Sequence, residues 1–373
     1  MDPEPNDQLA DDRRPAIIIY RAPLFNLSET FVRAHAQSLA RYRPLIVGLE
    51  DKGNVPPELR DSLYLRSRFG PISGLVERLR RQRPQLVHAH FATDGLAALR
   101  LSRALGVPLV TTLHGYDITR SRGRMLASGR LSWMAYALGR ERLMRAGDLY
   151  LPVSNTLHDA ALTQGFPAER TRTHYLGVDL ARFFPAGERE RRLILHVGRL
   201  VAKKGTSALI ESMTRLTGGT LAIIGDGPER GRLERQAAGL GERVRFLGAL
   251  APAEVGEWMR RASLLAAPSV TATDGDAEGL PTVIAEAAAC GLPVVATRHS
   301  GIPEAVVHGA TGFLVPENDV EALAERLALL LGSAELRERM GAAARKLAEE
   351  KFDLRRQTDR LEDIYDEMLG RAS

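Results

Sequence analysis

Cysteine is almost absent from this sequence, with Cys290 the single one among 373 residues. A chain with one cysteine forms no internal disulfide, which excludes the small disulfide-stabilised folds and indicates a reducing compartment, so we expect a cytoplasmic protein. Cys290 lies among small residues in AAACGLP, a setting typical of a buried structural thiol rather than a nucleophile.

Long hydrophobic runs are also missing. No stretch reaches the roughly 18 consecutive apolar residues that a membrane-spanning helix requires. Residues 1–14 are polar and acidic with two prolines, so we expect a disordered tail and not a secretion signal. A hydrophobic content of 44% with 26% charged residues is typical of a globular protein, and the length suits two domains.

Acidic residues are scarce in the first half of the chain. Residues 1–185 carry 26 Lys and Arg against 18 Asp and Glu, whereas residues 186–373 carry 25 against 28. Residues 120–145 hold seven Arg with one acidic residue, and residues 60–83 hold seven with two. Such stretches are either solvated helix faces or a patch for anionic lipid headgroups. The second alternative would place the protein peripherally at the inner face of the cytoplasmic membrane.

Apolar runs of strand length alternate with amphipathic helical stretches along the chain, which predicts parallel sheets covered on both faces. The series restarts once, after a charged stretch with proline and glycine at 181–192. We therefore predict an α/β protein of two Rossmann-like, doubly wound domains facing across a cleft, at 15–185 and 186–350, with a C-terminal helix at 351–373 that crosses back to the first domain. The expected strands are 16–22, 43–50, 86–92, 108–115, 148–154, 172–177, 192–200, 220–227, 243–250, 264–270, 293–299 and 312–316.

The strongest motif is EGLPTVIAE, from Glu278 to Glu286. Its Gly-Leu-Pro turn predicts the start of a helix that stops at Gly291, and the free N–H groups and positive dipole end there suit a diphosphate. Glu286, about one and a half turns into the helix, can accept hydrogen bonds from both hydroxyls of a ribose, while Glu278 reaches the other end of the same donor. Two isolated glutamates would more often be a helix cap and an incidental surface side chain, but the full string between two strands favours a binding site.

A second motif, GRLVAKKG, runs from Gly198 to Gly205 directly after a predicted strand. Arg199 and Lys204 lie on this glycine-bracketed loop, where cations stabilise the charge that develops on a leaving diphosphate. A cluster of charge on a loop usually marks solvated surface. Its position at the carboxyl end of a parallel strand favours a functional loop here.

Polar residues also follow strands of the first half. His114, in LHGYD, can donate a hydrogen bond to a sugar, although a histidine in such a place is often structural. Ser28, Glu29 and Thr30 follow the first strand, so we expect them, together with Asp117, to contact the acceptor or a phosphate. Asn26 and Glu29 also have the spacing of a capping box.

Two acidic motifs give weaker signals. The turn GDGPERG lacks the G-x-G-x-x-G spacing of dinucleotide-binding proteins, so we interpret it as a strand-to-helix turn with Asp226 in a nucleotide pocket. Asp274 and Asp276 form a D-x-D that could bind a divalent metal. A polar loop is favoured, because Arg199 and Lys204 already supply positive charge, and we expect no metal and no cofactor.

Several strings together resemble the family 4 glycosyltransferases, a retaining, metal-independent group with the GT-B fold: HVGRLVAKKG, IIGDGPER, VRFLGAL, EGLPTVIAEAAACGLPVVAT and GIPEAV. The resemblance spans most of the chain. It implies that Arg199 and Lys204 bind the donor diphosphate, that Glu286 holds the ribose and Glu278 the donor sugar, and that His114 touches this sugar and assists catalysis. The remaining donor-binding residues that we predict are Gly198, Asp226, Phe246, Leu247, Gly279, Leu280, Pro281 and Thr282.

Two loops depart from the family pattern. Arg21 begins a loop that is glycine-rich in many members, and Ser300 replaces the first glycine of a pair before IPE. SETF, HGYD and DGDAEGLP are similar to a bacterial subgroup that acts in exopolysaccharide or colanic acid-type assembly.

The resemblance implies a retaining hexosyltransferase that takes a UDP- or GDP-sugar and a sugar, lipid-linked or natural-product acceptor, in polysaccharide or glycoconjugate biosynthesis. A sugar-nucleotide epimerase or a phosphorylase of similar fold is the alternative enzyme, although no pyridoxal-binding lysine site is assignable. The isoelectric point of about 9.5 leaves a basic nucleic-acid-binding protein as the non-enzymatic alternative, but no recognisable module supports it.

Overall fold

A computed structural model describes residues 12–24, 29–51, 55–65 and 72–371. The chain divides into two compact units, the first made of Met1–Gly177 with Leu354–Ser373 and the second of Val178–Asp353. Of the predicted tail at 1–14, residues 1–11 lie outside the described part. No helix in that part is long and apolar enough to cross a membrane.

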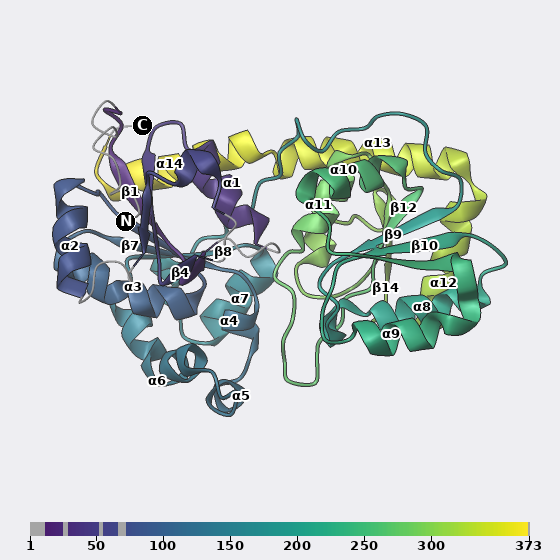
Figure 1. Cartoon of the computed structure of the whole chain (residues 1–373), viewed down its shortest axis with the longest axis horizontal. Coiled ribbons are helices and arrows are strands. Elements are labelled where there is room, and N and C mark those ends of the chain that lie inside the picture. Colours follow the sequence, from purple (N-terminus) through teal and green to yellow (C-terminus); the bar gives the residue numbers. More distant parts are fainter. Residues whose placement is uncertain (1–11, 25–28, 52–54, 66–71, 372–373) are drawn as a thin grey trace. The chain divides into compact units, whose positions relative to one another are not determined.

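The first unit contains a six-stranded parallel sheet in the order β5-β3-β1-β6-β7-β8 (Figure 1). Counted along the chain, this is the strand order 3-2-1-4-5-6 of Rossmann folds, whose ligands bind beyond the carboxyl ends of the strands. A separate pair, β2 (Pro23–Leu24) and β4 (Glu50–Asp51), lies outside this sheet. The sheet strands are β1 (Ala16–Tyr20), β3 (Arg43–Gly48), β5 (Leu63–Leu65), β6 (Val87–His90), β7 (Leu109–Leu113) and β8 (Leu149–Pro152).

Helices cover both faces of this sheet because its strands are apolar on both sides. Ile17 and Ile19 of β1 pack in one cluster with α1 (Thr30–Ser38) and α14 (Leu354–Met368). Figure 1 shows α3 below the strands and α14 above them. The other helices of the unit are α2 (Ile72–Arg81), α3 (Ala92–Leu105), α4 (Tyr116–Thr119), α5 (Arg122–Leu126), α6 (Leu131–Ala146) and α7 (Asn155–Thr163).

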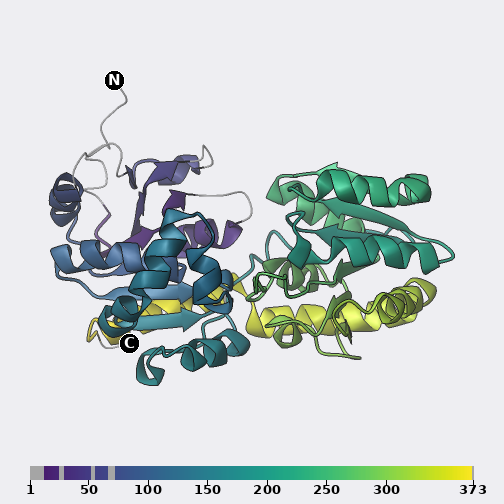
Figure 2. The same ribbon diagram turned by 90° about the horizontal axis from the view of Figure 1, so that it is seen from below.

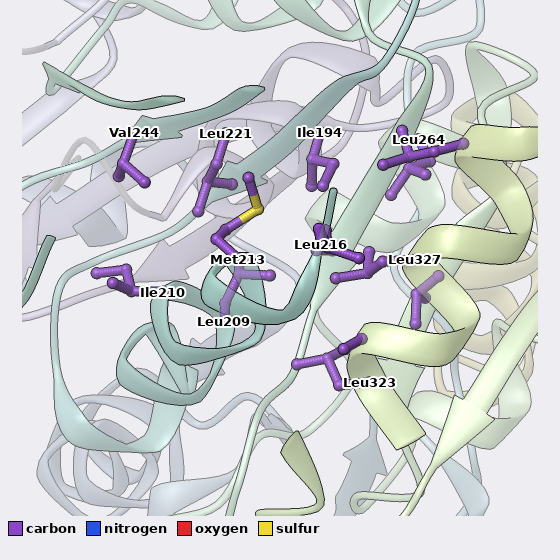
Figure 3. Packing of buried hydrophobic residues seen from close by; sticks show 14 of the residues in the cluster. Ile194, Leu209, Ile210, Met213, Leu216, Leu221, Val244, Leu264, Leu323 and Leu327 are labelled. Carbon is purple, nitrogen blue, oxygen red and sulfur yellow. The ribbon is translucent and has the colours of Figure 1, made fainter. Parts of the chain in front are cut away.

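The second unit repeats the arrangement with the parallel order β11-β10-β9-β12-β13-β14, again 3-2-1-4-5-6 along the chain. Leu209 and Met213 of α8 and Leu327 of α12 pack against Ile194 and Leu221 of the strands (Figure 3). The strands are β9 (Leu193–Val197), β10 (Thr220–Ile224), β11 (Val244–Gly248), β12 (Leu264–Ala267), β13 (Val294–Thr297) and β14 (Gly312–Val315). The helices are α8 (Thr206–Arg215), α9 (Arg230–Ala237), α10 (Pro252–Arg261), α11 (Thr282–Ala289), α12 (Val320–Gly332) and α13 (Ala334–Lys351).

The structure corrects three local expectations. Residues 172–177 form no strand, and the isolated bridge of this region joins Tyr150 to Thr171, just before them. The short strand β5 is an element that the sequence does not predict. The helix after the first strand begins at Thr30, so Glu29 is its N-cap residue and not the third helical residue that a capping box requires. Asn26, the other half of that box, lies outside the described residues.

The units divide at 177/178, before the expected boundary near 185, and again at 353/354, just after the expected start of the C-terminal segment at 351. At this point the N–H of Val178 donates a 2.7 Å hydrogen bond to the carbonyl of Phe352, so the outgoing and returning chain segments run side by side. The charged stretch at 181–192 therefore belongs to the second unit. The last helix, α14, belongs to the first unit, and its yellow ribbon lies among the blue ribbons of that unit in Figure 2.

Candidate functional site

The predicted cations of the second unit lie on a loop in which two glycines are in close contact with neighbouring groups. This loop connects β9 to α8 and contains a short 3-10 helix, Ala202–Lys204. A Cβ atom at Gly198 would lie 3.2 Å from the Lys204 side chain, and one at Gly205 would lie 1.8 Å from the carbonyl oxygen of Pro268. Glycine at both positions lets the loop fold closely at the carboxyl end of β9, with Lys204 lying over Gly198.

Gly205→Ala should destabilise the protein by about 3 kcal/mol, because Gly205 has φ +65° and its new methyl group would overlap Pro268. Gly231→Ala is the matched control, since Gly231 is helical and a Cβ there meets nothing nearer than 3.6 Å. The control should be neutral or stabilise by up to about 1 kcal/mol. Chemical denaturation measures both, and equal effects would contradict this account of the loop.

Glu278 meets these cations inside the unit. Its Oε1 atom lies 3.0 Å from Nζ of Lys204 and 3.8 Å from Nζ of Lys203, which also pairs with Asp276 at 3.1 Å. Lys204 and Glu278 form an ion pair, but their groups are not oriented for a hydrogen bond. Burial alone would raise the pKa of Glu278, but Lys204 and Lys203 outweigh burial and hold this pKa at about 2. Glu278 is therefore a buried, ionised carboxylate.

The backbone of Glu278 is held by the loop after β13. His299 Nε2 accepts a 3.0 Å hydrogen bond from the N–H of Glu278, so the ring proton lies on Nδ1, which donates to Glu317 at 2.6 Å. Ser300 has a positive φ of 44°, a conformation that favours glycine. Its hydroxyl donates to the Glu278 carbonyl at 2.5 Å, a contact that glycine could not make.

Glu286 lies on the helix that follows. Pro281 is the N-cap residue of α11, one position before the first helical turn where we expected it, and Gly291 follows the helix with φ +65°. Burial raises the pKa of Glu286 to about 7, and Arg182 and Lys204 offset only part of this rise. No described residue donates a hydrogen bond to its side chain, so its oxygens remain available to a ligand.

Other predicted donor contacts of the second unit lie at neighbouring strand ends. Arg199 is exposed and makes no ion pair with any described residue. Phe246 and Leu247 lie half-buried at the end of β11. Asp226 is exposed, and its carboxylate pairs with Arg230 at 3.1 Å and accepts a bond from the N–H of Gly227. This pairing occupies Asp226 and points to a structural role in the turn.

The first unit presents His114 at the end of β7. Its ring stacks on Phe31 at 4.3 Å between ring centroids and lies 4.4 Å from Phe91, and its Nε2 atom lies 3.0 Å from Nδ1 of His90. Burial lowers the pKa of His114 well below its usual value, with Arg21 adding to the effect. The imidazole is therefore neutral at physiological pH, and Phe91, which borders it, has an uncommon positive φ of 72°.

Asp117 does not have the expected geometry of an acceptor contact. It is fully buried, and its carboxylate accepts hydrogen bonds from the N–H groups of His114, Gly115 and Ala92 at 2.8–3.1 Å. Burial raises the pKa of this carboxyl group, and the backbone donors oppose that rise. Asp117 therefore holds the turn that carries His114.

Glu29 is likewise occupied inside the first unit. The guanidinium of Arg21 forms two hydrogen bonds with Glu29, at 2.8 and 2.6 Å, and one with Asp94 at 2.7 Å, and it lies 4.3 Å from the ring of Phe91. Glu29 thus orients a buried cation, which we did not expect to be its role. Thr30 is half-buried at the start of α1, and Ser28 lies outside the described residues.

Sequence reasoning missed most of the polar groups that surround His114. His88 and His90 alternate on β6 and so share one face of the sheet, a spacing that could have drawn attention to HAHF. From the sequence, Arg21 is recognisable only as the start of a loop that departs from the family pattern. Tyr365 is joined to this cluster across more than 250 residues, a separation that no local pattern reveals.

Two family profiles together match most of both units. The sequence profile described as "Glycosyltransferase Family 4" matches residues 28–182, and the profile described as "Glycosyl transferases group 1" matches residues 179–347. The "putative colanic acid biosynthesis glycosyltransferase WcaL" of Salmonella typhimurium is 37% identical over 252 residues, which is 64% of this chain and 60% of that protein. The match thus spans about three fifths of that relative's length.

An "alpha-D-kanosaminyltransferase" of Streptomyces kanamyceticus is 31% identical over 313 residues, 78% of this chain and 80% of that protein. Among solved structures, HepE of Anabaena in complex with UDP and glucose has a TM-score of 0.78 and 22% identity, covering 95% of this chain and all of that chain. The shared architecture is the predicted GT-B fold, and the resemblance to bacterial exopolysaccharide and colanic acid enzymes is confirmed. The chain belongs to glycosyltransferase family 4.

Proposed function

We propose that this protein is a retaining glycosyltransferase that moves a hexose from a nucleotide-diphosphate sugar to an acceptor in polysaccharide or glycoconjugate biosynthesis. The observation that carries the proposal is the ion pair of Lys204 with the buried carboxylate of Glu278, beside the start of α11. It combines a cation for a leaving diphosphate with an ionised carboxylate for sugar hydroxyls. Membership of the family and the relatives named for exopolysaccharide assembly support it.

The residues of the second unit suit a donor of this chemistry. Lys204 and Arg199 attract the diphosphate, and the N–H groups at the start of α11 favour a phosphate oxygen. Glu286 has free oxygens that can accept bonds from the two ribose hydroxyls. A structural neighbour was solved with UDP and glucose, so a UDP-sugar is the first donor to test, ahead of a GDP-sugar.

The proposed reaction breaks the bond between the anomeric carbon and the diphosphate. Lys204 and Arg199 stabilise the negative charge on the departing nucleotide diphosphate, and this stabilisation is greatest in the transition state. Glu278 binds sugar hydroxyls and is held by cations on one side, so we assign it no role as a nucleophile. The acceptor then attacks from the face that the diphosphate leaves, a donor phosphate oxygen takes the acceptor's proton, and the anomeric configuration is retained.

A donor screen followed by product analysis tests this function. Thermal shift with UDP-, GDP- and ADP-sugars should show one nucleotide class that raises the melting temperature. Incubation of that donor with candidate acceptors should give a product whose anomeric proton, observed by NMR, has the donor's configuration. An inverted product would refute retention. Interconversion of the sugar nucleotide without transfer would favour the epimerase alternative, and an absorbance band of bound pyridoxal would favour the phosphorylase.

We further propose that α5 and α6 bring the protein to an anionic membrane surface that carries a lipid-linked acceptor. Leu131 and Leu138, seven residues apart on α6, are 83% and 65% exposed. Arg130, Arg142 and Arg145 lie exposed on or beside the same helix. Apolar side chains that project between arginines suit the boundary between lipid headgroups and acyl chains.

Leu131→Asp with Leu138→Asp should lower binding to vesicles of phosphatidylcholine and phosphatidylglycerol by at least about tenfold, since each leucine loses its apolar burial and meets repulsion instead. Leu329→Asp is the matched control, because Leu329 is also exposed but lies on α12 of the second unit. Vesicle sedimentation measures binding. Equal binding of the wild type to phosphatidylcholine alone at low salt would exclude the anionic surface.

A further inference from the structure

Six side chains form an unbroken row of hydrogen bonds through the interior of the first unit. All come from that unit, and five of them are buried while the last reaches the end of β7. They come from four elements and the loop after β7, including the C-terminal helix. In order, the members of this hydrogen-bonded row are Thr112, His88, Tyr365, His35, His90 and His114.

The first half of the row joins β7 to the C-terminal helix. The hydroxyl of Thr112 lies 2.7 Å from Nε2 of His88, and Nδ1 of His88 lies 2.5 Å from the hydroxyl of Tyr365. The Tyr365 hydroxyl then lies 2.9 Å from Nε2 of His35 on α1. Tyr365 is therefore placed to donate one hydrogen bond and accept another.

The second half ends at the predicted sugar contact. Nδ1 of His35 lies 2.9 Å from Nε2 of His90, and Nδ1 of His90 lies 3.0 Å from Nε2 of His114. No described residue is a hydrogen-bond partner of the remaining ring nitrogen, Nδ1 of His114. The row thus connects a buried threonine to a ring nitrogen that is free to meet a ligand.

The histidines of the row are uncharged. Burial lowers the pKa of His35 to about 3 and holds the pKa values of His88, His90 and His114 well below their usual range. Burial also raises the pKa of Tyr365 well above its usual value, so the phenol keeps its proton. Each neutral ring carries one N–H donor and one acceptor nitrogen, so every bond in the row must point the same way.

Thr112 selects between the two directions. It is 3% exposed, and its hydroxyl has no hydrogen-bond partner among the described residues other than His88. If the bonds pointed toward Thr112, His88 would donate to it and the buried hydroxyl proton would have no acceptor, which is costly. Thr112 therefore donates to His88, and each following bond is directed toward His114.

We propose that this row fixes His114 in the tautomer that accepts at Nε2 and carries its proton on Nδ1. Tyr365, more than 250 residues away, is then a positioning residue for the hydrogen bond that His114 offers to the sugar. The tautomer follows from the first unit alone. Only its consequence for turnover rests on the proposed function.

A metal site is the competing use of the same rings. Nitrogen atoms of His35, His88 and His90 lie within 4.8 Å of one another and border a cavity of about 40 Å³. All six nitrogens of these rings already have hydrogen-bond partners, however, so an ion would have to replace several of these bonds. The hydrogen-bonded row thus supplies a partner for both nitrogens of each of these three rings.

NMR of protein labelled with ¹⁵N-histidine tests the row directly, since ring ¹⁵N shifts report which nitrogen carries the proton. The wild type should show His114 protonated on Nδ1. Tyr365→Phe and Thr112→Val should each convert this signal to a mixture of tautomers, and kcat should fall about tenfold with the donor KM unchanged. Tyr42→Phe is the matched control, because the buried Tyr42 hydroxyl also bonds α14, through Asp366, but lies outside the row.

Three results would overturn the proposal. These are a proton on Nε2 of His114 in the wild type, an unchanged tautomer in both variants, and an equal change in the Tyr42→Phe control. Stoichiometric Zn²⁺ that shifts the His35, His88 and His90 signals together would assign the cluster to a metal instead. If no sugar donor is ever turned over, the proposed function fails, but the NMR experiment still shows whether the row fixes the tautomer of His114.

Discussion

Replacement of Lys204 by alanine is expected to lower kcat/KM for the donor by about two to three orders of magnitude, the range found when one charge-stabilising donor is removed from an active site. Lys204 Nζ lies 3.0 Å from the buried carboxylate of Glu278, on a loop at the carboxyl end of β9. A compact cation there stabilises the charge of a departing diphosphate. Initial rates of nucleotide release, with saturating acceptor, measure the effect.

Lys203 supplies the matched control for this prediction. It is the next residue on the same loop, but it pairs with Asp276 at 3.1 Å and approaches Glu278 only to 3.8 Å. Lys203→Ala should therefore lower kcat/KM for the donor by less than about tenfold. Arg199→Ala removes an exposed and unpaired cation, so it should lower kcat/KM about as much as Lys204→Ala does. Equal rates for the two lysine variants, both folded by thermal melting, would contradict the special role of Lys204.

The second half of the chain could be predicted well from the sequence because its signals are local. Each of its six strands is a short apolar run, and each functional motif lies in the segment that follows such a run. Parallel strands bring their carboxyl ends to one edge, so GRLVAKKG and EGLP had to meet there, as Lys204 and Glu278 do. Hydrophobic pattern and strand order were sufficient for that juxtaposition.

The polar interior of the first half could not be predicted in the same way. Their positions after strands predict ligand contacts for Glu29 and Asp117. In the structure, however, Arg21 and the backbone around His114 already occupy their oxygens. Whether a carboxylate faces a ligand or its own fold depends on contacts between distant segments. The pairing of Tyr365 with His35 and His88 is the extreme case, since α14 returns from the far end of the chain.

Glu286 should make donor binding depend on pH. Burial raises the pKa of Glu286 to about 7, and its ionised form accepts bonds from ribose hydroxyls better than its protonated form. The value of kcat/KM for the donor should therefore fall about tenfold per pH unit below 7 and level off above about pH 8. Glu286→Gln should remove this dependence and bind the donor more weakly at pH 8. Persistence of the same pH profile in the glutamine variant would assign it to another group.

Ionisation of Glu286 should improve donor binding but lower the free energy of unfolding of the protein without donor. The folded pKa of Glu286, about 7, lies above its usual value of 4.5, so between these values the folded state binds more protons than the unfolded state. The contribution of Glu286 to the free energy of unfolding is thus greatest below pH 4.5 and is lost as pH rises through 7. Glu286→Gln should flatten this part of the curve, measured by denaturation from pH 5 to 8. Raising the pH would then improve donor binding and lower the stability of the protein without donor. Added donor should therefore increase the free energy of unfolding more at pH 8 than at pH 6.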